Sequence, residues 1–456
     1  MVNLEQLRKQ AKELVRAARA GDAEALARLE GREPILARAQ LVVAREHGYA
    51  SWPALVNAVE ANAESFVLAA TNGQRTRAES LLAARPELAD DPWAKLVLGR
   101  GWDADPNEPG GPRGWAPLLY VCHSCFPSAT LARELLSRGA DPNVTFDNEY
   151  GAMSALYGAA GVAHDPELTR VLLEAGANPD DGESLYHATE SQSTECLRLL
   201  LEHGAQTEHT NALAHALDEE RLEHVRLLLA AGIDTTDAAY VAHAVRRGRG
   251  PEFVRLLAAH GADVDRPGGE TWRGDVPLRT PYQHAVLRGR DELMEALEAL
   301  GASTEVSEAD RAVGEVARGR RPTTALPTEL DADPLEVLIL TALWRDLDLV
   351  LELVGPNFVG VVGGSPPGSL LHSAAFVGQP ATVATLLDRG ADPSVDLGFG
   401  TPLAAAVRGS AYHTFPGREY VEVAELLAAA GNAVEAEFLD LADGPLVAWV
   451  EERLEA

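Results

Sequence analysis

One phrase recurs along this chain of 456 residues and constrains its fold more than any other feature. Residues 135–143 read Leu-Leu-Ser-Arg-Gly-Ala-Asp-Pro-Asn, and residues 386–393 read Leu-Leu-Asp-Arg-Gly-Ala-Asp-Pro. Weaker copies have their glycine at positions 176, 204, 232, 261 and 301, so that neighbouring copies from Gly139 to Gly301 are 28 to 40 residues apart. A period in this range predicts a solenoid, in which each unit buries its apolar face against its neighbours.

Each copy fits one helix–turn–helix unit. An apolar helix such as residues 168–173 precedes the glycine, whose left-handed conformation ends a helix at low steric cost. The Asp-Pro-Asn sequence then turns the chain, and a short alanine-rich helix follows, as at residues 369–375 and 401–406. Pro402 stands in the first turn of such a helix, where the missing N–H is not needed. The sequence therefore predicts an all-α repeat protein.

The helices that begin Ser-Leu-Leu-His-Ser-Ala-Ala and Thr-Pro-Leu-Ala-Ala-Ala, together with the Leu-Leu-x-x-Gly-Ala-Asp phrase, resemble the ankyrin-repeat family of bacterial type. The resemblance covers about residues 63–431. It implies a solenoid of nine or ten helix–turn–helix repeats with β-turn fingers and with helical caps at both ends. It also implies a concave surface that binds another molecule, without specifying which one.

Four segments are expected along the chain. Residues 1–60 are a helical cap, residues 61–301 an array with long and short fingers, and residues 370–456 the last repeats with a closing helix. Residues 302–369 fit the period poorly, with a helix at 309–319, a loop at 320–327 and helices at 335–343 and 347–354. One repeat with an insertion and two damaged repeats both remain open for this segment.

The charge of the chain limits its partners. It carries 69 Asp and Glu against 39 Lys and Arg, a formal net charge of −30. An acidic array repels phosphates, so nucleic acid is not an expected ligand, whereas a basic peptide, a cation or an amine is electrostatically easier to bind. No apolar stretch is long enough to span a membrane, the first residues lack an apolar signal core, and three cysteines do not make a disulfide framework. A cytoplasmic location is therefore expected.

The lengths of the fingers predict where binding takes place. The units that end at Gly204, Gly232 and Gly261 have steps of 28 or 29 residues, too short for a full hairpin finger. Long connections lie on both sides, at residues 105–115 and 141–154 and at residues 263–280. Long loops beside short ones are often functional, and two such sets would enclose a pocket on the concave face.

Several residues of this region depart from the family pattern with side chains that can carry chemistry. The turn at residues 180–183 is acidic and precedes a helix that contains His187, on the histidine position of the family, where hydrogen bonding to backbone is the expected role. Tyr157 takes that position in the preceding repeat, and four aromatic residues would line the walls. The candidate contacts are Trp115, Tyr120, His123, Tyr150, Tyr157, Asp180, Asp181, Glu183, Tyr186, His187, Trp272 and Arg273.

Other motifs carry weaker predictions. His215, His243 and His284 occupy equivalent positions in successive inner helices. Packed helices are roughly 8–10 Å apart, so we expect buried imidazoles bonded to one another or to backbone rather than a shared metal ion. Cys122 and Cys125 form a Cys-x-x-Cys at the end of a helix, with Cys122 facing the core, which suits neither redox chemistry nor zinc. No phosphate-binding loop, metalloprotease motif or nucleophile elbow is present in the sequence, and no cofactor is expected.

The leading hypothesis from the sequence is a non-catalytic ankyrin-repeat scaffold that binds a partner protein or peptide in an acidic concave groove. The alternative is an enzyme or a small-molecule-binding protein that uses Glu183, His187, Tyr157 and His123 around the same pocket for acid–base or ligand contacts.

Overall fold

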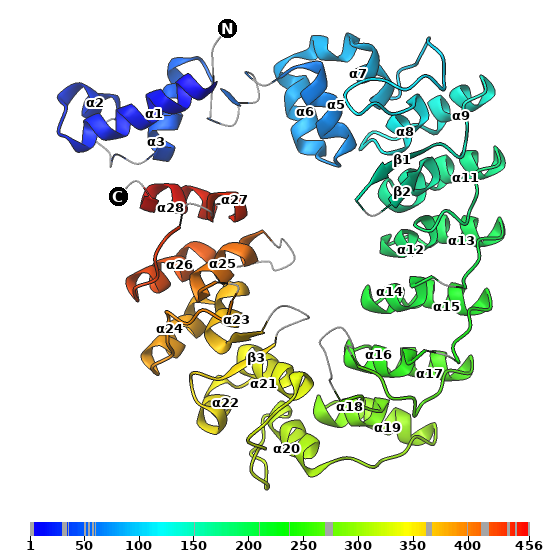
Figure 1. The fold of residues 1–456 in the computed structure, drawn as a ribbon, viewed down its shortest axis with the longest axis vertical. Coiled ribbons are helices and arrows are strands. Elements are labelled where there is room, and N and C mark those ends of the chain that lie inside the picture. The colour runs from blue at the N-terminus through cyan, green and yellow to red at the C-terminus, as the bar shows by residue number, and fades with distance from the viewer. Residues whose placement is uncertain are drawn as a thin grey trace. The chain divides into compact units, whose positions relative to one another are not determined.

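The chain divides by its internal contacts into two compact units, Met1–Asp234 (unit 1) and Thr235–Ala456 (unit 2). The structure is a computed structural model in which the following residues are described: 4–29, 34, 36–49, 52, 55–56, 59, 61–149, 151–208, 210–236, 238–269, 277–361, 367–398, 400–411, 419–435, 438–442 and 445–454. Figure 1 shows pairs of helices stacked in chain order within each unit, as expected for an all-α repeat solenoid. Among the described residues, no helix is both long and apolar enough to cross a membrane.

Unit 1 begins with helices α1 (Leu4–Arg19), α2 (Ala23–Arg28) and α3 (Leu36–Glu46). Their buried apolar side chains, among them Leu7 and Val43, form a hydrophobic core of their own between residues 7 and 55. Helix α1 is amphipathic, because its leucine and alanine positions recur with helical spacing and its charged residues occupy the opposite side. The first segment is therefore helical, as the sequence predicts.

The rest of unit 1 consists of helix pairs, in which we call the first helix inner and the second outer. The inner helices are α5 (Ala63–Thr71), α8 (Pro117–Cys122), α10 (Ala155–Tyr157) continued by η2 (Gly158–Val162), α12 (Ser184–His187) continued by η3 (Ala188–Glu190), and α14 (Ala212–Asp218). The outer elements are α6 (Arg75–Ala84) with η1 (Pro86–Asp90) and α7 (Pro92–Val97), α9 (Ala129–Ser137), α11 (Pro166–Glu174), α13 (Glu195–Glu202) and α15 (Leu222–Ala230). The first repeat is thus enlarged by η1 and α7.

Unit 2 continues the same pattern. Its inner helices are α16 (Tyr240–Arg246), α18 (Pro281–Leu287), α20 (Glu308–Ala317), α21 (Ala332–Trp344), α23 (Leu370–Phe376) and α25 (Pro402–Ser410). Its outer helices are α17 (Pro251–Ala259), α19 (Asp291–Ala299), α22 (Leu347–Val354), α24 (Pro380–Asp388) and α26 (Tyr420–Ala429), followed by α27 (Phe438–Leu441) and α28 (Pro445–Leu454).

The irregular segment of unit 2 has a simple explanation. Helix α20 is followed by residues 318–331, which contain no helix, and then by the complete pair of α21 and α22. One inner helix therefore lacks an outer helix, and a non-helical connection takes its place. The predicted helices at residues 309–319, 335–343 and 347–354 are all confirmed.

Inner helices of unit 2 approach one another closely, as the small residues of the repeat predict. A methyl group added at Gly409 of α25 would lie 1.9 Å from the carbonyl oxygen of Phe376, the last residue of α23. A methyl group at Gly314 of α20 would lie 2.2 Å from the carbonyl oxygen of Val286 in α18. Both distances are far below van der Waals contact, so only glycine fits at these two crossings.

The recurring glycines end the outer helices. All seven, from Gly139 to Gly390, have a φ angle between 86° and 93°, in the left-handed region that favours glycine. At Gly139 the next residue completes the cap, because the Ala140 N–H donates to the carbonyl of Leu135 at 3.0 Å. The prediction made from the repeat phrase is therefore confirmed at the level of the backbone.

The Asp-Pro-Asn turns connect one repeat to the next. The Asp141 carboxylate accepts a hydrogen bond from the Asn143 N–H at 2.9 Å, which closes the turn. The Asn143 side chain then donates to the carbonyl of Gly176 at 3.1 Å and accepts from the N–H of Asn178 at 2.7 Å. Asn107 makes the same pair of bonds to Gly139 and Asp141, and Asn357 makes them to Gly390 and Asp392.

We expect Asn143→Ala to lower the free energy of unfolding by about 1–2 kcal/mol, because two hydrogen bonds between repeats are lost. The midpoint of urea unfolding, followed by circular dichroism, measures the change. Glu149→Ala is the matched control, since Glu149 is exposed in the same connection. Equal midpoints for the two variants would show that the turn-to-turn bonds add nothing to stability.

The long and short connections between repeats differ as predicted. Strands β1 (Thr145–Asn148) and β2 (Gly151–Ser154) pair in antiparallel register, with Thr145 opposite Ser154, and β3 (Val359–Val361) pairs with β4 (Pro367–Ser369). Single bridges join Gly110 to Trp115 and Gly268 to Arg279. The described residues between α11 and α12 and between α13 and α14 contain no strand. Within the described residues, hairpin-like fingers therefore form in long connections and not in these short ones.

Candidate functional site

A row of aromatic and imidazole rings runs along the inner helices of unit 1. The ring centroids of His123 and Tyr157 are 5.7 Å apart, and those of Tyr157 and His187 are 5.0 Å apart. The row ends where Tyr186 stacks on His215 at 4.0 Å. These residues come from the end of α8 and from α10, α12 and α14, and they become neighbours because the inner helices of successive repeats stack on one another.

The N-terminal part of this row is buried and structural. Tyr120 is fully buried, and its hydroxyl donates to the carbonyl of Gly110 and accepts from the N–H of Arg113, both at 2.8 Å. Trp115 is 9% exposed and stacks on Phe146 at 4.1 Å. Both residues hold the first fingers on α8, so their expected role as surface contacts is corrected.

His123 also lies inside the protein rather than on the groove. Its side chain is buried, and its Nε2 lies 2.9 Å from the carbonyl oxygen of Ser154. Burial lowers the pKa of His123 to about 4, so its ring is neutral at pH 7 and donates to this carbonyl. The prediction that His123 faces a ligand is wrong, because the ring is buried and Phe146 and Ser154 of the next finger lie against it.

The acidic turn before α12 is occupied by its own hydrogen bonds. The Asp181 carboxylate accepts from the N–H groups of Glu183 and Ser184, at 3.1 and 2.8 Å, and from two serine hydroxyls. The Asp180 carboxylate accepts from the N–H of Gln206 at 2.6 Å. These two side chains therefore fix the turn and link it to the next repeat.

His187 contacts two carboxylates instead of backbone. Its Nδ1 lies 2.7 Å from Glu190 and its Nε2 lies 3.3 Å from Glu183. The prediction that His187 bonds to backbone is therefore wrong. Glu190 was missed by the sequence reasoning, although its position three residues after His187 on one helix face could have indicated it.

His215 completes this group from the next repeat. Its Nδ1 lies 2.8 Å from the hydroxyl oxygen of Thr189, and its Nε2 lies 4.0 Å from Glu190. Tyr157, Glu183, Tyr186, His187, Glu190 and His215 are each partly exposed, and we call these six residues the Tyr–His–Glu face. Burial, followed by the charges of nearby carboxylates, raises the pKa values of Tyr157 and Tyr186.

The chemistry of the Tyr–His–Glu face suits a cation. The carboxylates of Glu183 and Glu190 are 34% and 37% exposed, and partly exposed tyrosine rings lie beside them. Carboxylates accept charge-assisted hydrogen bonds, and the faces of tyrosine rings attract ammonium and guanidinium groups. Among the described residues, no group of three or more His, Cys, Asp or Glu has the arrangement of a metal site.

Three candidate residues cannot be assigned a position. Tyr150, Trp272 and Arg273 lie outside the described residues. The pocket expected between the two sets of long fingers therefore stays a prediction. The Cys122 thiol, in contrast, is fully buried at the end of α8, as the sequence predicts, and burial raises its pKa.

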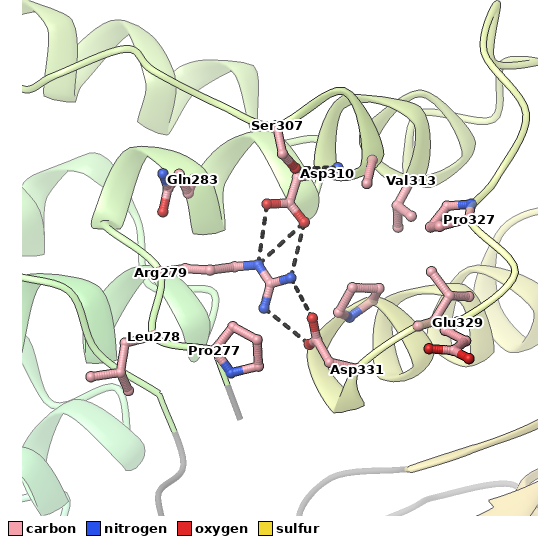
Figure 2. Close-up of a pocket in the computed structure, with 13 residues that line it drawn as sticks. Pro277, Leu278, Arg279, Gln283, Ser307, Asp310, Val313, Pro327, Glu329 and Asp331 are labelled. Carbon is pink, nitrogen blue, oxygen red and sulfur yellow. Dashed lines mark hydrogen bonds and ion pairs between the residues drawn. The ribbon is translucent and has the colours of Figure 1, made fainter. Parts of the chain in front are cut away.

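Unit 2 contains a buried ionic cluster that the sequence reasoning missed. The Arg279 guanidinium, 8% exposed, bonds Asp310 at 3.0 Å and Asp331 at 2.8 Å (Figure 2). It also lies 3.4 Å from Asp333. Burial alone would lower the pKa of Arg279, but the hydrogen bonds and charges of Asp331 and Asp310 raise it overall. Arg279 precedes α18, Asp310 lies in α20, and Asp331 caps α21, so this cluster ties three inner helices together.

A second guanidinium and a histidine extend the cluster. His284 is fully buried; its Nε2 lies 2.9 Å from the carbonyl of Gly268, and its Nδ1 lies 3.1 Å from the Arg288 guanidinium. Burial lowers the pKa of His284 well below its usual range, so its Nε2–H donates and its Nδ1 accepts. The expected burial and backbone bonding of the histidine column are thus confirmed at His284. The same prediction is wrong for His215, which is partly exposed and contacts the hydroxyl group of Thr189.

Comparison with known proteins agrees with this geometry. Residues 156–239 match the family model described as ankyrin repeats in three copies. The chain contains ankyrin repeats. The segment matched by the ankyrin model contains every residue of the Tyr–His–Glu face. Ankyrin repeats are generally scaffolds for protein–protein interaction, and they typically bind protein partners.

Three solved structures illustrate the similarity of this ankyrin-repeat protein to others. An ankyrin repeat domain from Acinetobacter baumannii is 26% identical, with a TM-score of 0.35, over 41% of this chain and 98% of that one. The ankyrin repeat domain of human ASB11 is 20% identical, with a TM-score of 0.36, over 52% and 96%. The ankyrin repeat domain of Bcl-3, a member of the IkappaB protein family, is 22% identical, with a TM-score of 0.33, over 51% and 97%. None of the curated proteins matches the chain.

Proposed function

We propose that this ankyrin-repeat protein is a scaffold that binds a partner protein through the Tyr–His–Glu face, and that the partner presents basic side chains to it. The observation that carries the proposal is the pair of partly exposed carboxylates, Glu183 and Glu190, held on both sides of His187. Tyrosine rings next to them supply apolar area and a negative ring face. The net charge of −30 favours the same class of partner.

The geometry of this face favours a protein segment over a small polar ligand. Its residues are spread over α10, α12, η3 and α14, so an extended segment can contact several repeats at once. Tyrosine is enriched at the centres of protein interfaces, because it buries a large area and keeps a polar end. We further propose that Tyr150, Trp272 and Arg273 of the long fingers belong to the contact surface.

We also propose the division of the chain into an N-terminal cap (1–60), a first array (61–301), an irregular segment (302–369) and a C-terminal array with a closing helix (370–456). The separate hydrophobic core of α1 to α3 supports the first boundary. The non-helical residues 318–331 support the treatment of the third segment as distinct.

The test compares two double variants of equal charge. Partners of the parent protein are identified by affinity capture and mass spectrometry, and the affinity of each purified partner is then measured by calorimetry. Glu183→Gln with Glu190→Gln is expected to weaken binding about tenfold, and raising the salt concentration is expected to weaken binding of the parent.

The control carries Glu174→Gln and Glu202→Gln, which remove the same charge from exposed positions of the outer helices α11 and α13. The control is expected to bind like the parent. If both double variants hold every partner equally well, the Tyr–His–Glu face is not the binding surface.

A further inference from the structure

A pocket lies beside the ionic cluster of unit 2. Its volume is about 350 Å³, and it is formed by the residues before α18, by α20 and by residues 327–334. Its apolar wall consists of proline and aliphatic side chains, among them Pro277, Leu278, Val313, Pro327, Leu330 and Pro334. Leu278 is 51% exposed, so an apolar side chain stands at the entrance.

The charges on the wall of this pocket are unequal. Asp310, Glu329 and Asp331 line it, and Arg279 is the one basic residue among the described residues that do so (Figure 2). Every nitrogen of the Arg279 guanidinium already bonds Asp310 or Asp331. Among the described lining residues, no basic group is therefore left to pair with a further carboxylate.

Glu329 is that further carboxylate. It is exposed at the edge of the pocket, opposite Pro277 and Leu278 in Figure 2, and it makes no ion pair or hydrogen bond within the described part of the chain. Asp331 is 27% exposed, so its carboxylate can be reached from the pocket while it holds Arg279. These carboxylates would repel an anionic ligand, whereas a bound cation would reduce the repulsion among them.

We propose that this pocket binds a protonated primary amine on a short alkyl chain. The proline and aliphatic wall covers the methylene groups, and the ammonium group donates to Glu329 and Asp331. No aromatic side chain belongs to the described lining, so the pocket offers carboxylate acceptors for N–H groups and no ring faces for a quaternary ammonium.

The size of the pocket fits a ligand of this class. Ligand pockets range from about 300 to 1,000 Å³, and this one lies at the lower end, where a single alkylammonium chain is accommodated. The site is separate from the Tyr–His–Glu face, since all of its residues belong to unit 2, and it does not depend on the function proposed for that face. A lysine side chain of a partner and a free diamine share the chemistry that the pocket recognises.

The test uses isothermal titration calorimetry of the full chain with n-pentylammonium chloride. Saturable binding is expected, and two probes separate its contributions. The uncharged 1-pentanol and the N–H-free tetramethylammonium ion are each expected to bind at least about tenfold more weakly. Absence of saturable binding, or equal affinity for 1-pentanol, would overturn the proposal.

Two variants locate the binding. Glu329→Gln is expected to weaken pentylammonium binding at least about threefold, because it removes an exposed charge next to the ammonium group. Glu295→Gln removes the same charge from an exposed position of α19 outside the pocket and is expected to leave the affinity unchanged. Both positions are exposed, so both variants are expected to fold. Equal affinities of the two variants would overturn the proposed position of the amine.

A final comparison distinguishes the two sources of the amine. If N-acetyl-lysine methylamide binds as tightly as n-pentylammonium, the pocket accepts a lysine side chain of a protein. If it fails to bind while 1,5-diaminopentane binds, the ligand is a free amine. If none of the three amines binds, the proposal for this pocket is wrong. The protein-binding function proposed for unit 1 is not affected by that result.

Discussion

Replacing Arg279 with methionine is expected to lower the stability of unit 2 by about 3–5 kcal/mol, the usual effect of leaving buried charges without their partner. The side chains of Asp310 and Asp333 are only 10% and 3% exposed, so solvent cannot take the place of the guanidinium. The substitution keeps most of the side-chain volume and removes the charge. Hydrogen exchange of amides in α18, α20 and α21, measured by mass spectrometry, reports the loss locally.

The matched control for this experiment is Arg311→Met, because Arg311 is exposed on the same helix as Asp310. The control is expected to exchange its amides like the parent. Adding Asp310→Asn to Arg279→Met is expected to restore part of the protection, since the buried carboxylate whose only ion pair within the described residues is with Arg279 is then neutral. If Arg279→Met exchanges like the control, the cluster does not hold the three helices together.

The fold could be predicted from the sequence because its determinants are local and repeated. A glycine after an apolar helix needs no distant partner to adopt its left-handed conformation, and each of the seven predicted positions does so. The pair of α21 and α22 was predictable for the same reason. Its second apolar run ends at Gly355, whose φ angle of 80° lies in the left-handed region that favours glycine. Local signals of this kind are independent of how the repeats stack.

The candidate site was less predictable, because its contacts connect different repeats. Sequence position placed His123, Tyr157 and His187 in neighbouring inner helices, which is confirmed by their ring contacts. It could not show that the finger ending at Ser154 lies against His123. Burial of a side chain depends on loop conformation, which a repeat pattern does not encode.

The ionic cluster of unit 2 illustrates the same limit. Arg279 pairs with residues that are 31, 52 and 54 positions further along the chain, across a connection of irregular length. These separations do not follow the repeat period, so no pattern in the sequence predicts that these residues pair. Glu190 differs, because its pairing with His187 is local to one helical segment and follows from a spacing of three residues.

The second large effect concerns pH. Burial lowers the pKa of His123 from its ordinary value of 6.5 to about 4, so the folded state favours the neutral ring. The stabilisation is fully present above pH 6.5 and is lost progressively as the pH falls towards 4. A difference of this size corresponds to about 3 kcal/mol, at 1.4 kcal/mol per pKa unit.

His123→Gln is the variant that isolates this effect, because the glutamine amide can still donate to the carbonyl of Ser154 while it does not titrate. The free energy of unfolding, measured at several pH values between 7 and 4, is expected to fall by about 3 kcal/mol more in the parent than in the variant. His224, His284 and His372, whose pKa values are also lowered by burial, remain in both proteins and cancel. Parallel curves for the two proteins would mean that His123 can take up a proton without opening the finger that lies against it, and its burial would then have no cost in acid.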